Sequence, residues 1–259
     1  MQGPLQMLLI IVILAPAVSA RDLPNPADGA AQLPRGRELL GQSPTAWDMD
    51  ECARAGALRD LADCGWGFGK EAGGGRSGSI YQVTHLGDST EYPQPGTLRH
   101  ALTRPYSVWV TFNPGHMVIN LKAYLDVPSG TTIDGRGARV EIVGRGLYLQ
   151  NKSNVIVTHV SIHNCLTDCI SLRRSRDIWI NHVDLYRGGD GLIDITKTST
   201  RVTVSHCHLH DHHKAMLLGA SNENVEASDS ARERSLDLQS VSEGVRTCCR
   251  GFRKVLADG

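Results

Sequence analysis

Three segments of the chain repeat one pattern, and this repeat constrains the fold more than any other feature of the sequence. The segments are NVIVTHVSIHNC (154–165), DIWINHVDLYRG (177–188) and RVTVSHCHLHDH (201–212). They begin 23 and 24 residues apart, and the apolar residues and one histidine recur at the same positions in each copy. A repeat of this length is typical of a fold built from similar units stacked on one another.

The pattern within one copy indicates how each unit bends. Val155, Val157 and His159 have one parity on a strand, whereas Val160 and Ile162 have the other parity and are also apolar. Because successive side chains point to opposite faces, one flat strand cannot bury both sets on the same side. A corner between positions 159 and 160 lets two short strands face a common interior. The predicted fold is therefore all-β, a parallel β-helix whose coils pair strand by strand.

The decapeptide SHCHLHDHHK (205–214) holds five histidines, and the repeat predicts how they are arranged. The histidines that share the corner position and are expected to stack are His159, His182 and His206. His208 and His210 alternate with interior positions, so they are expected to point toward solvent. A zinc site needs convergent ligands, and histidines on different faces do not supply them. The decapeptide is therefore interpreted as a corner ladder plus surface histidines.

The N-terminus and the overall charge bear on where the protein acts. Residues 1–20 carry an apolar run, Leu8–Leu14, followed by AVSA, which predicts a secretory signal peptide. The alternative, a membrane anchor, is less favoured because the run is well short of the about 20 residues that span a bilayer. With 27 basic and 27 acidic residues and no basic stripe, a nucleic-acid partner is not expected. We expect a secreted, extracellular monomer without a membrane partner once the signal is removed.

The segments that precede the repeat are read from their composition. Residues 21–45 are rich in Pro, Gly and Arg and indicate a linker or pro-segment, and 46–64 predict a short N-terminal helix. Cys52 and Cys64 bracket that helix, and export favours a disulfide between them over two separate thiols. The seven cysteines are an odd number, so at least one is unpaired within the chain. The sequon NKS predicts glycosylation at Asn151.

Polar residues gather in the segments that connect the repeated strands. The candidates are Asp168, Asp190, Asp194 and Lys214. Carboxylates beside an ammonium suit a hard cation and an anionic ligand, and oxygen-only donors favour Ca²⁺ over zinc. On an extended strand Asp190 and Asp194 would be ~13 Å apart, so a turn at Gly189 and Gly191 is needed to bring them together. The alternative is a solvated turn with paired charges.

Several ordered blocks carry a family resemblance over residues 46–221. They include LADCGWGFGKEAGGGRSGSIYQVT, PGTLRHAL, TTIDGRGARVEI, DGLIDITKTSTRVTVS and HHKAMLLGAS. In these blocks the chain resembles the plant-type pectate lyases, polysaccharide lyase family 1. The resemblance implies a right-handed parallel β-helix and a secreted, Ca²⁺-dependent pectate lyase. Such an enzyme cleaves polygalacturonate (pectate) of plant cell walls by β-elimination.

The resemblance also implies roles for individual residues. Asp168 matches one aspartate of the family's Asp-x-Asp-x-Ile calcium element, and Leu166 stands where the family has the other. Asp190 and Asp194 match the acidic calcium ligands that follow. Lys214 matches the lysine that binds a substrate carboxylate.

The sequence departs from the family after Ser221. The family's base is an arginine in an Arg-x-Pro-x-x-Arg block, and no segment here matches it, so no catalytic residue is identified. Residues 222–259 show no repeat and are expected to be an unrelated, irregular tail. The prediction is thus a partial domain over 46–221, apparently truncated at its C-terminus. The alternative function is a catalytically inactive, pectate-binding relative.

Overall fold

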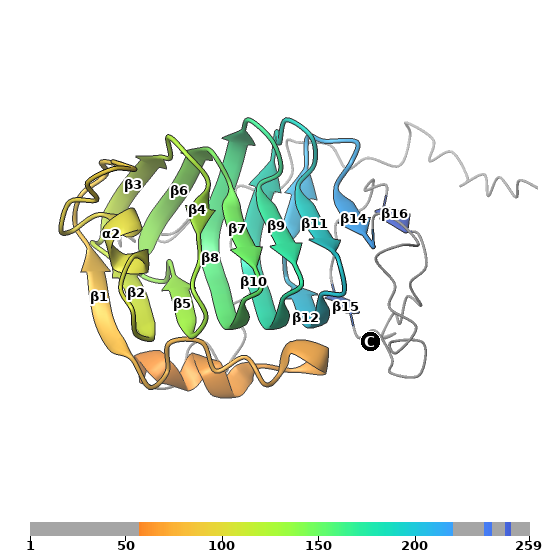
Figure 1. Cartoon of the computed structure of the whole chain (residues 1–259), viewed down its shortest axis with the longest axis horizontal. Helices are drawn as coiled ribbons and strands as arrows, with labels where there is room; N and C mark the ends of the chain where they lie inside the picture. Colours follow the sequence, from red (N-terminus) through yellow and green to blue (C-terminus); the bar gives the residue numbers. More distant parts are fainter. Residues whose placement is uncertain (1–56, 220–235, 240–246, 250–259) are drawn as a thin grey trace, which may run out of the picture. The chain divides into compact units, whose positions relative to one another are not determined.

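The computed structural model describes residues 57–219, 236–239 and 247–249 (Figure 1). All of them belong to one compact unit, residues 39–259. The helices in the described part are short: the 3-10 helices η1 (Leu58–Cys64) and η2 (Gly67–Gly69) and the α-helix α2 (Leu98–Leu102). None of these described helices is long and apolar enough to cross a membrane.

Parallel strands form two sheets (Figure 1). The first sheet runs through β1 (Ser79–Val83), β2 (Val108–Phe112), β5 (Thr131–Asp134), β8 (Ser153–Cys165), β10 (Arg176–Tyr186), β12 (Thr200–Ser205) and β15 (Leu236–Gln239). Three further strands join it at the side: β3 (Gly115–Asn120), β6 (Ala138–Gly144) and β13 (His208–His210). The second sheet holds β4 (Leu125–Asp126), β7 (Leu147–Gln150), β9 (Ile170–Arg173), β11 (Ile193–Thr196), β14 (Met216–Leu218) and β16 (Thr247–Cys249). The predicted parallel β-helix is confirmed.

The register of the strands follows the sequence repeat. Ile178 of β10 lies opposite Val155 of β8 and Val202 of β12. Beyond the corner, Leu185 lies opposite Ile162 and Leu209. Equivalent residues of successive copies are therefore neighbours on successive coils, as the spacing predicts.

The predicted corner is made by a left-handed backbone conformation. His159, His182 and His206 have φ values of 55°, 49° and 50°. This turn lets Val157 and Val160 both reach the interior, where they are 1% and 3% exposed. Other left-handed residues recur at fixed places of the coils: Asn151, Arg174 and Thr198; Asn154, Asp177 and Arg201; Asn164, Arg187 and Asp211.

A second apolar cluster lies outside the coils. The outward-facing Trp109, Ile156 and Trp179 are buried together with Leu61 of η1. The Gly69 N–H donates a hydrogen bond of 2.9 Å to Thr203 Oγ1. The segment before β1 therefore covers the outer face of the first sheet, a contact that the repeat did not predict.

Several expectations concern parts of the chain with few or no described residues. Residues 1–20 and 21–45, and Cys52, lie outside the described residues. The described part of the predicted 46–64 helix is the 3-10 helix η1, ending at Cys64. Cys64 is disulfide-bonded, and its pairing with Cys52 stays a prediction. Among the described cysteines, Cys165, Cys169 and Cys207 are buried and free.

The segment after Ser221 differs from the expected irregular tail at two places. β15 pairs in parallel with β12, placing Leu236 and Leu238 opposite Val202 and Val204. β16 pairs in parallel with β14. The alternation of leucine with polar residues in LDLQ is the short sequence signal that accompanies β15.

Candidate functional site

The four predicted site residues lie at neighbouring strands of the second sheet. Asp168 comes just before β9, Asp194 is in β11, and Asp190 is in the turn that leads into β11. Lys214 precedes β14, the next strand of the sheet. Three successive coils therefore contribute side chains to the region where β9, β11 and β14 begin.

The glycine-rich turn before β11 brings the carboxylates of two coils together. The Gly189 N–H donates to the Thr167 carbonyl at 2.9 Å, which fixes the turn against the preceding coil. A Cβ placed on Gly191 would lie 3.0 Å from Asp168 Oδ1 and 3.5 Å from Asp194 Oδ1. Both oxygens therefore border the same small space beside Gly191, which a larger residue would fill.

The electrostatics of this space favour a bound cation. Burial, and then the charges of Asp168 and Asp190, raises the pKa of Asp194 to about 7. Burial also raises the pKa of Asp168, although Ser171 Oγ donates a hydrogen bond of 3.1 Å to its Oδ2. Asp168 Oδ1 is buried and has no hydrogen-bond partner among the described residues. A buried carboxylate oxygen without a partner is costly, and a divalent cation removes that cost.

Lys214 lies at the exposed side of this group. Its Nζ donates to Asp190 Oδ1 at 2.7 Å, and both side chains are well exposed. The hydrogen bond from Lys214 lowers the pKa of Asp190, and the same bond raises the pKa of Lys214. Asp190 and Lys214 are 24 residues apart in the sequence, which is one coil.

Other residues near the site were missed by sequence reasoning. Arg173, exposed at the end of β9, lowers the pKa of both Asp168 and Asp194 through its charge. Ser171 lies opposite Asp194 in the strand register, so the repeat contained the signal that could have found it. Leu166 is 65% exposed, which leaves its side chain free of the core.

Asn151 lies apart from this group. It is exposed and adopts a left-handed turn with φ 55° just before β8. Its glycosylation stays a prediction.

The sequence pattern that defines a family described as pectate lyase matches residues 61–236. The chain belongs to the pectate lyase family. It is 42% identical to putative pectate lyase 2 of Arabidopsis thaliana, over 69% of this chain and 53% of that protein. It is 39% identical to pectate lyase 1 of Chamaecyparis obtusa, over 67% of this chain and 54% of that protein.

Solved structures give the same fold. The crystal structure of Jun a 1, the major allergen from cedar pollen, superposes with a TM-score of 0.68 at 33% identity, over 74% of this chain and 63% of that chain. A mutant Bacillus subtilis pectate lyase superposes with a TM-score of 0.51 at 17% identity and supports the fold alone. The chain spans about half the length of the curated pectate lyases that it matches.

Proposed function

We propose that this protein is a secreted, monomeric, Ca²⁺-dependent pectate lyase that binds polygalacturonate of plant cell walls along the outer face of the second sheet. Family membership supports the substrate class and the reaction, a β-elimination across the glycosidic bond. The observation that carries the proposal for the site is the convergence of Asp168 and Asp194 on the space beside Gly191.

Asp168, Asp190 and Asp194 would hold the ion. Their donors are all oxygen atoms, which suits Ca²⁺ better than zinc. Two observations support this fit. Asp168 Oδ1 is buried without a hydrogen-bond partner among the described residues. Burial and the neighbouring carboxylates raise the pKa of Asp194, and a bound cation would offset both effects. When bound, Ca²⁺ withdraws electron density from a substrate carboxylate and makes the neighbouring C5 proton more acidic.

Lys214 and Arg173 would bind the anionic substrate. Lys214 has its ammonium at the surface, beside the carboxylate group, where a galacturonate carboxylate can replace Asp190 as its partner. Arg173 adds a second exposed cation at the end of β9, which is separated from β14 by β11. Positive charge beside the substrate carboxylate stabilises the charge that develops when the C5 proton leaves.

The base that removes this proton is not assigned to any residue. The family resemblance implies an arginine in an Arg-x-Pro-x-x-Arg block, and the sequence after Ser221 contains no match to that block. This departure favours a second candidate function, a protein that binds pectate through Ca²⁺ without cleaving it.

One experiment separates the two functions. The full chain, expressed as a secreted protein, is incubated with polygalacturonate in Ca²⁺ and in chelator, and both binding and the ultraviolet absorbance of the unsaturated product are measured. A Ca²⁺-dependent rise in absorbance would support the lyase, whereas Ca²⁺-dependent binding without product would support the binding protein. Folded protein that neither binds pectate nor forms product would contradict both.

Substitutions distinguish the residues that bind the ion from those that bind the substrate. We expect Asp194→Asn to weaken Ca²⁺ binding at least about tenfold by calorimetry, because it removes one charged ligand. Lys214→Gln is expected to keep Ca²⁺ affinity within about twofold and to weaken pectate binding. The matched control is Asp126→Asn, which removes an exposed carboxylate paired with Lys152 in the same sheet. Equal losses in Asp126→Asn and Asp194→Asn would contradict the assignment.

A further inference from the structure

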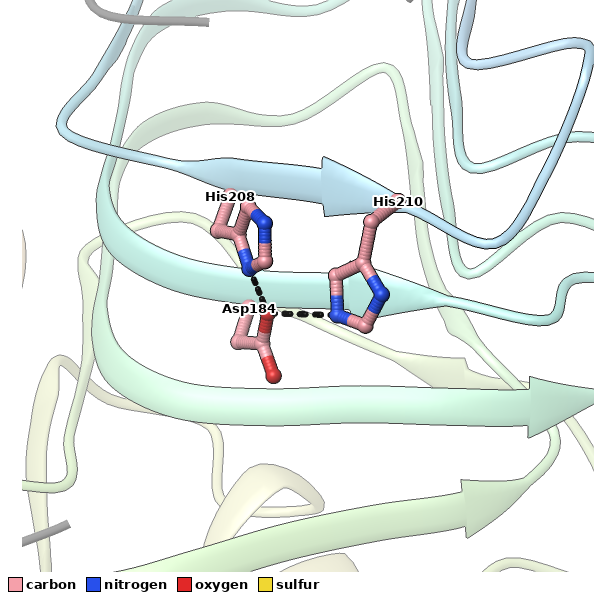
Figure 2. Close-up of side chains that lie close together, drawn as sticks. All are labelled: Asp184, His208 and His210. Carbon is pink, nitrogen blue, oxygen red and sulfur yellow. Dashed lines mark hydrogen bonds and ion pairs between the residues drawn. The ribbon is translucent and has the colours of Figure 1, made fainter. Parts of the chain in front are cut away.

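A second group of ligating side chains lies on the first sheet, away from the carboxylates described above. Asp184 of β10 lies directly opposite His208 of β13 in the parallel register. His210 is two residues further along β13, so it shares the outward face of His208. Figure 2 shows both imidazole rings directed toward the Asp184 carboxylate.

The distances within this group are close to those of a metal centre. Asp184 Oδ1 lies 3.0 Å from His208 Nδ1 and 3.1 Å from His210 Nε2. One ligand atom from each of the three residues lies within 4.8 Å of the other two. Around a tetrahedral zinc ion with bonds of about 2.0–2.1 Å, neighbouring ligand atoms are about 3.3 Å apart. Two of the three separations therefore need little change to accept an ion.

The donor set selects the kind of metal. Two imidazole nitrogens and one carboxylate oxygen suit zinc, copper or nickel, whereas Ca²⁺ takes oxygen donors. The side chains of His208 and His210 are 30% exposed and that of Asp184 is 24% exposed. Solvent can therefore supply a fourth ligand, while the strands hold the other three.

The rings are held in place before any ion binds. The His210 ring stacks on Tyr186 at 4.6 Å between centroids, and Tyr186 stacks on His163 at 4.3 Å. His210 Nδ1 lies 3.5 Å from Asp211 Oδ2, so a carboxylate lies beside the ring nitrogen that does not face Asp184. A carboxylate on the second nitrogen of a ligating histidine is a common feature of metal sites.

A similar group on the same sheet shows what is special about this one. Glu141 also contacts two histidines, His116 at 2.8 Å and His163 at 3.2 Å, but through different oxygen atoms. Within the part of the chain that the structure describes, three ligand atoms of His, Cys, Asp or Glu lie within 4.8 Å of one another only at Asp184, His208 and His210. Convergence therefore separates a ligand set from an ordinary hydrogen-bonded pair.

We infer that Asp184, His208 and His210 form a binding site for a divalent transition metal, with Zn²⁺ as the first ion to test. The site is independent of the Ca²⁺ group, because it lies on a different sheet and uses different donors. Bound metal would join the coil of β10 to the coil of β13.

The test is calorimetric titration of the full chain with ZnCl₂ in saturating Ca²⁺. We expect one Zn²⁺ per chain, and a loss of affinity of at least about tenfold in His210→Gln and in Asp184→Asn. His116→Gln, which alters the Glu141 group on the same face, is expected to leave Zn²⁺ affinity unchanged. Asp194→Asn is expected to weaken Ca²⁺ binding and to keep Zn²⁺ binding, so failure of one site is distinguishable from failure of the other.

The contradicting outcomes are equally concrete. Absence of Zn²⁺ binding by the folded wild-type chain would overturn the inference and leave a hydrogen-bonded triad. So would Zn²⁺ binding that survives in His210→Gln but is lost in His213→Gln, because the ion would then belong to the exposed end of the decapeptide. Thermal unfolding of each variant without metal, compared with wild type, shows whether a loss of binding reflects a loss of folding.

Discussion

At the scale of single residues, the corner histidines act by packing. The His159, His182 and His206 rings stack at 4.7 Å between successive centroids. Burial, and then the charges of His182 and Arg136, lowers the pKa of His159 to about 3. At neutral pH the His159 ring is therefore uncharged, which is why it stacks on His182 without repulsion.

The lowered pKa of His159 predicts a loss of stability in acid. In the unfolded chain the His159 ring takes up a proton near its ordinary pKa of 6.5, whereas in the folded chain its pKa is about 3. The contribution of the neutral His159 ring to the free energy of unfolding is therefore complete above pH 6.5. It is lost as the pH falls from 6.5 toward 3, by at most ~1.4 kcal/mol per pH unit. We expect His159→Asn, which keeps a residue tolerant of the left-handed corner, to flatten this slope in denaturant unfolding measured across that range.

The control is the exposed His85, which lies outside the ladder. His85→Asn should leave the slope as it is in wild type. A slope that His159→Asn does not change would mean that other groups cause the acid sensitivity.

Leu166 offers a gain-of-function prediction at the calcium group. Its side chain is exposed, and the family resemblance implies an aspartate at this position. Leu166→Asp adds a carboxylate two residues before Asp168, so we expect Ca²⁺ affinity to rise about three- to tenfold by calorimetry, as ligand charge increases. Leu166→Asn, which adds an oxygen without the charge, should give a smaller gain. Weaker Ca²⁺ binding in Leu166→Asp than in wild type would argue against a cation at this group.

At the scale of elements, each coil is shaped by left-handed residues at repeated positions. Residues other than glycine are strained in this conformation, by about 1–2 kcal/mol each, and among them Asn and Asp tolerate it best. The left-handed residues Asn154 and Asp177 fit this preference, whereas the left-handed Arg174 does not. The strain persists because pairing with the next coil holds the backbone in place.

The left-handed conformation of Arg174 predicts that glycine is more stabilising than valine at this position, the reverse of the order at an ordinary strand residue. It is exposed with φ 49°, and its N–H donates to the carbonyls of Thr196 and Lys197. We expect Arg174→Gly to be more stable than Arg174→Val by at least about 1 kcal/mol in denaturant unfolding, because valine cannot adopt this conformation without strain. At the exposed strand residue Gln82 the order should reverse, with valine above glycine. The same order at both positions would contradict the role of the corner.

The sequence predicted the elements well where copies could be compared. The interior rows, the corner and the histidine ladder all followed from alternation within copies that align without gaps. It did not predict that the outward Trp179 is buried by residues 58–72, because a covering contact between distant segments leaves no periodic signal. The interpretation of the decapeptide also leaves out Asp184, which lies one coil earlier in the sequence, although the repeat register pairs Asp184 with His208.

At the scale of the whole molecule, the proposed Ca²⁺ ligands lie on two successive coils, Asp168 just before β9 and Asp190 and Asp194 at the start of β11. In a solenoid each repeat contacts only its neighbours, so stability is approximately a sum over repeats and their interfaces. A ligand bound by Asp168, Asp194 and the turn at Asp190 would act on those interfaces directly. Binding to the folded state alone raises the free energy of unfolding as the ligand concentration exceeds its dissociation constant.

Calcium should therefore stabilise the folded chain. At a Ca²⁺ concentration about 100 times the dissociation constant, we expect the free energy of unfolding to rise by about 2.7 kcal/mol. Thermal and denaturant unfolding in Ca²⁺ and in chelator would measure the difference. Asp194→Asn, whose Ca²⁺ affinity is expected to be at least about tenfold weaker, should show about half of this increase or less, whereas His210→Gln should show all of it. An equal effect of Ca²⁺ on wild type and Asp194→Asn would place the ion elsewhere.

The fixed register of the coils has a consequence for how such a protein can vary over time. Corner residues Asp177 and Arg201 are 24 positions apart, one full coil. A deletion or duplication of one such length would rejoin the interior rows in frame, so the core would tolerate it. The same event would remove or double Asp184, Asp190 and Asp194 together. If these carboxylates bind ions as proposed, one such event would remove or add ion-binding capacity by a whole coil while the apolar core stays continuous.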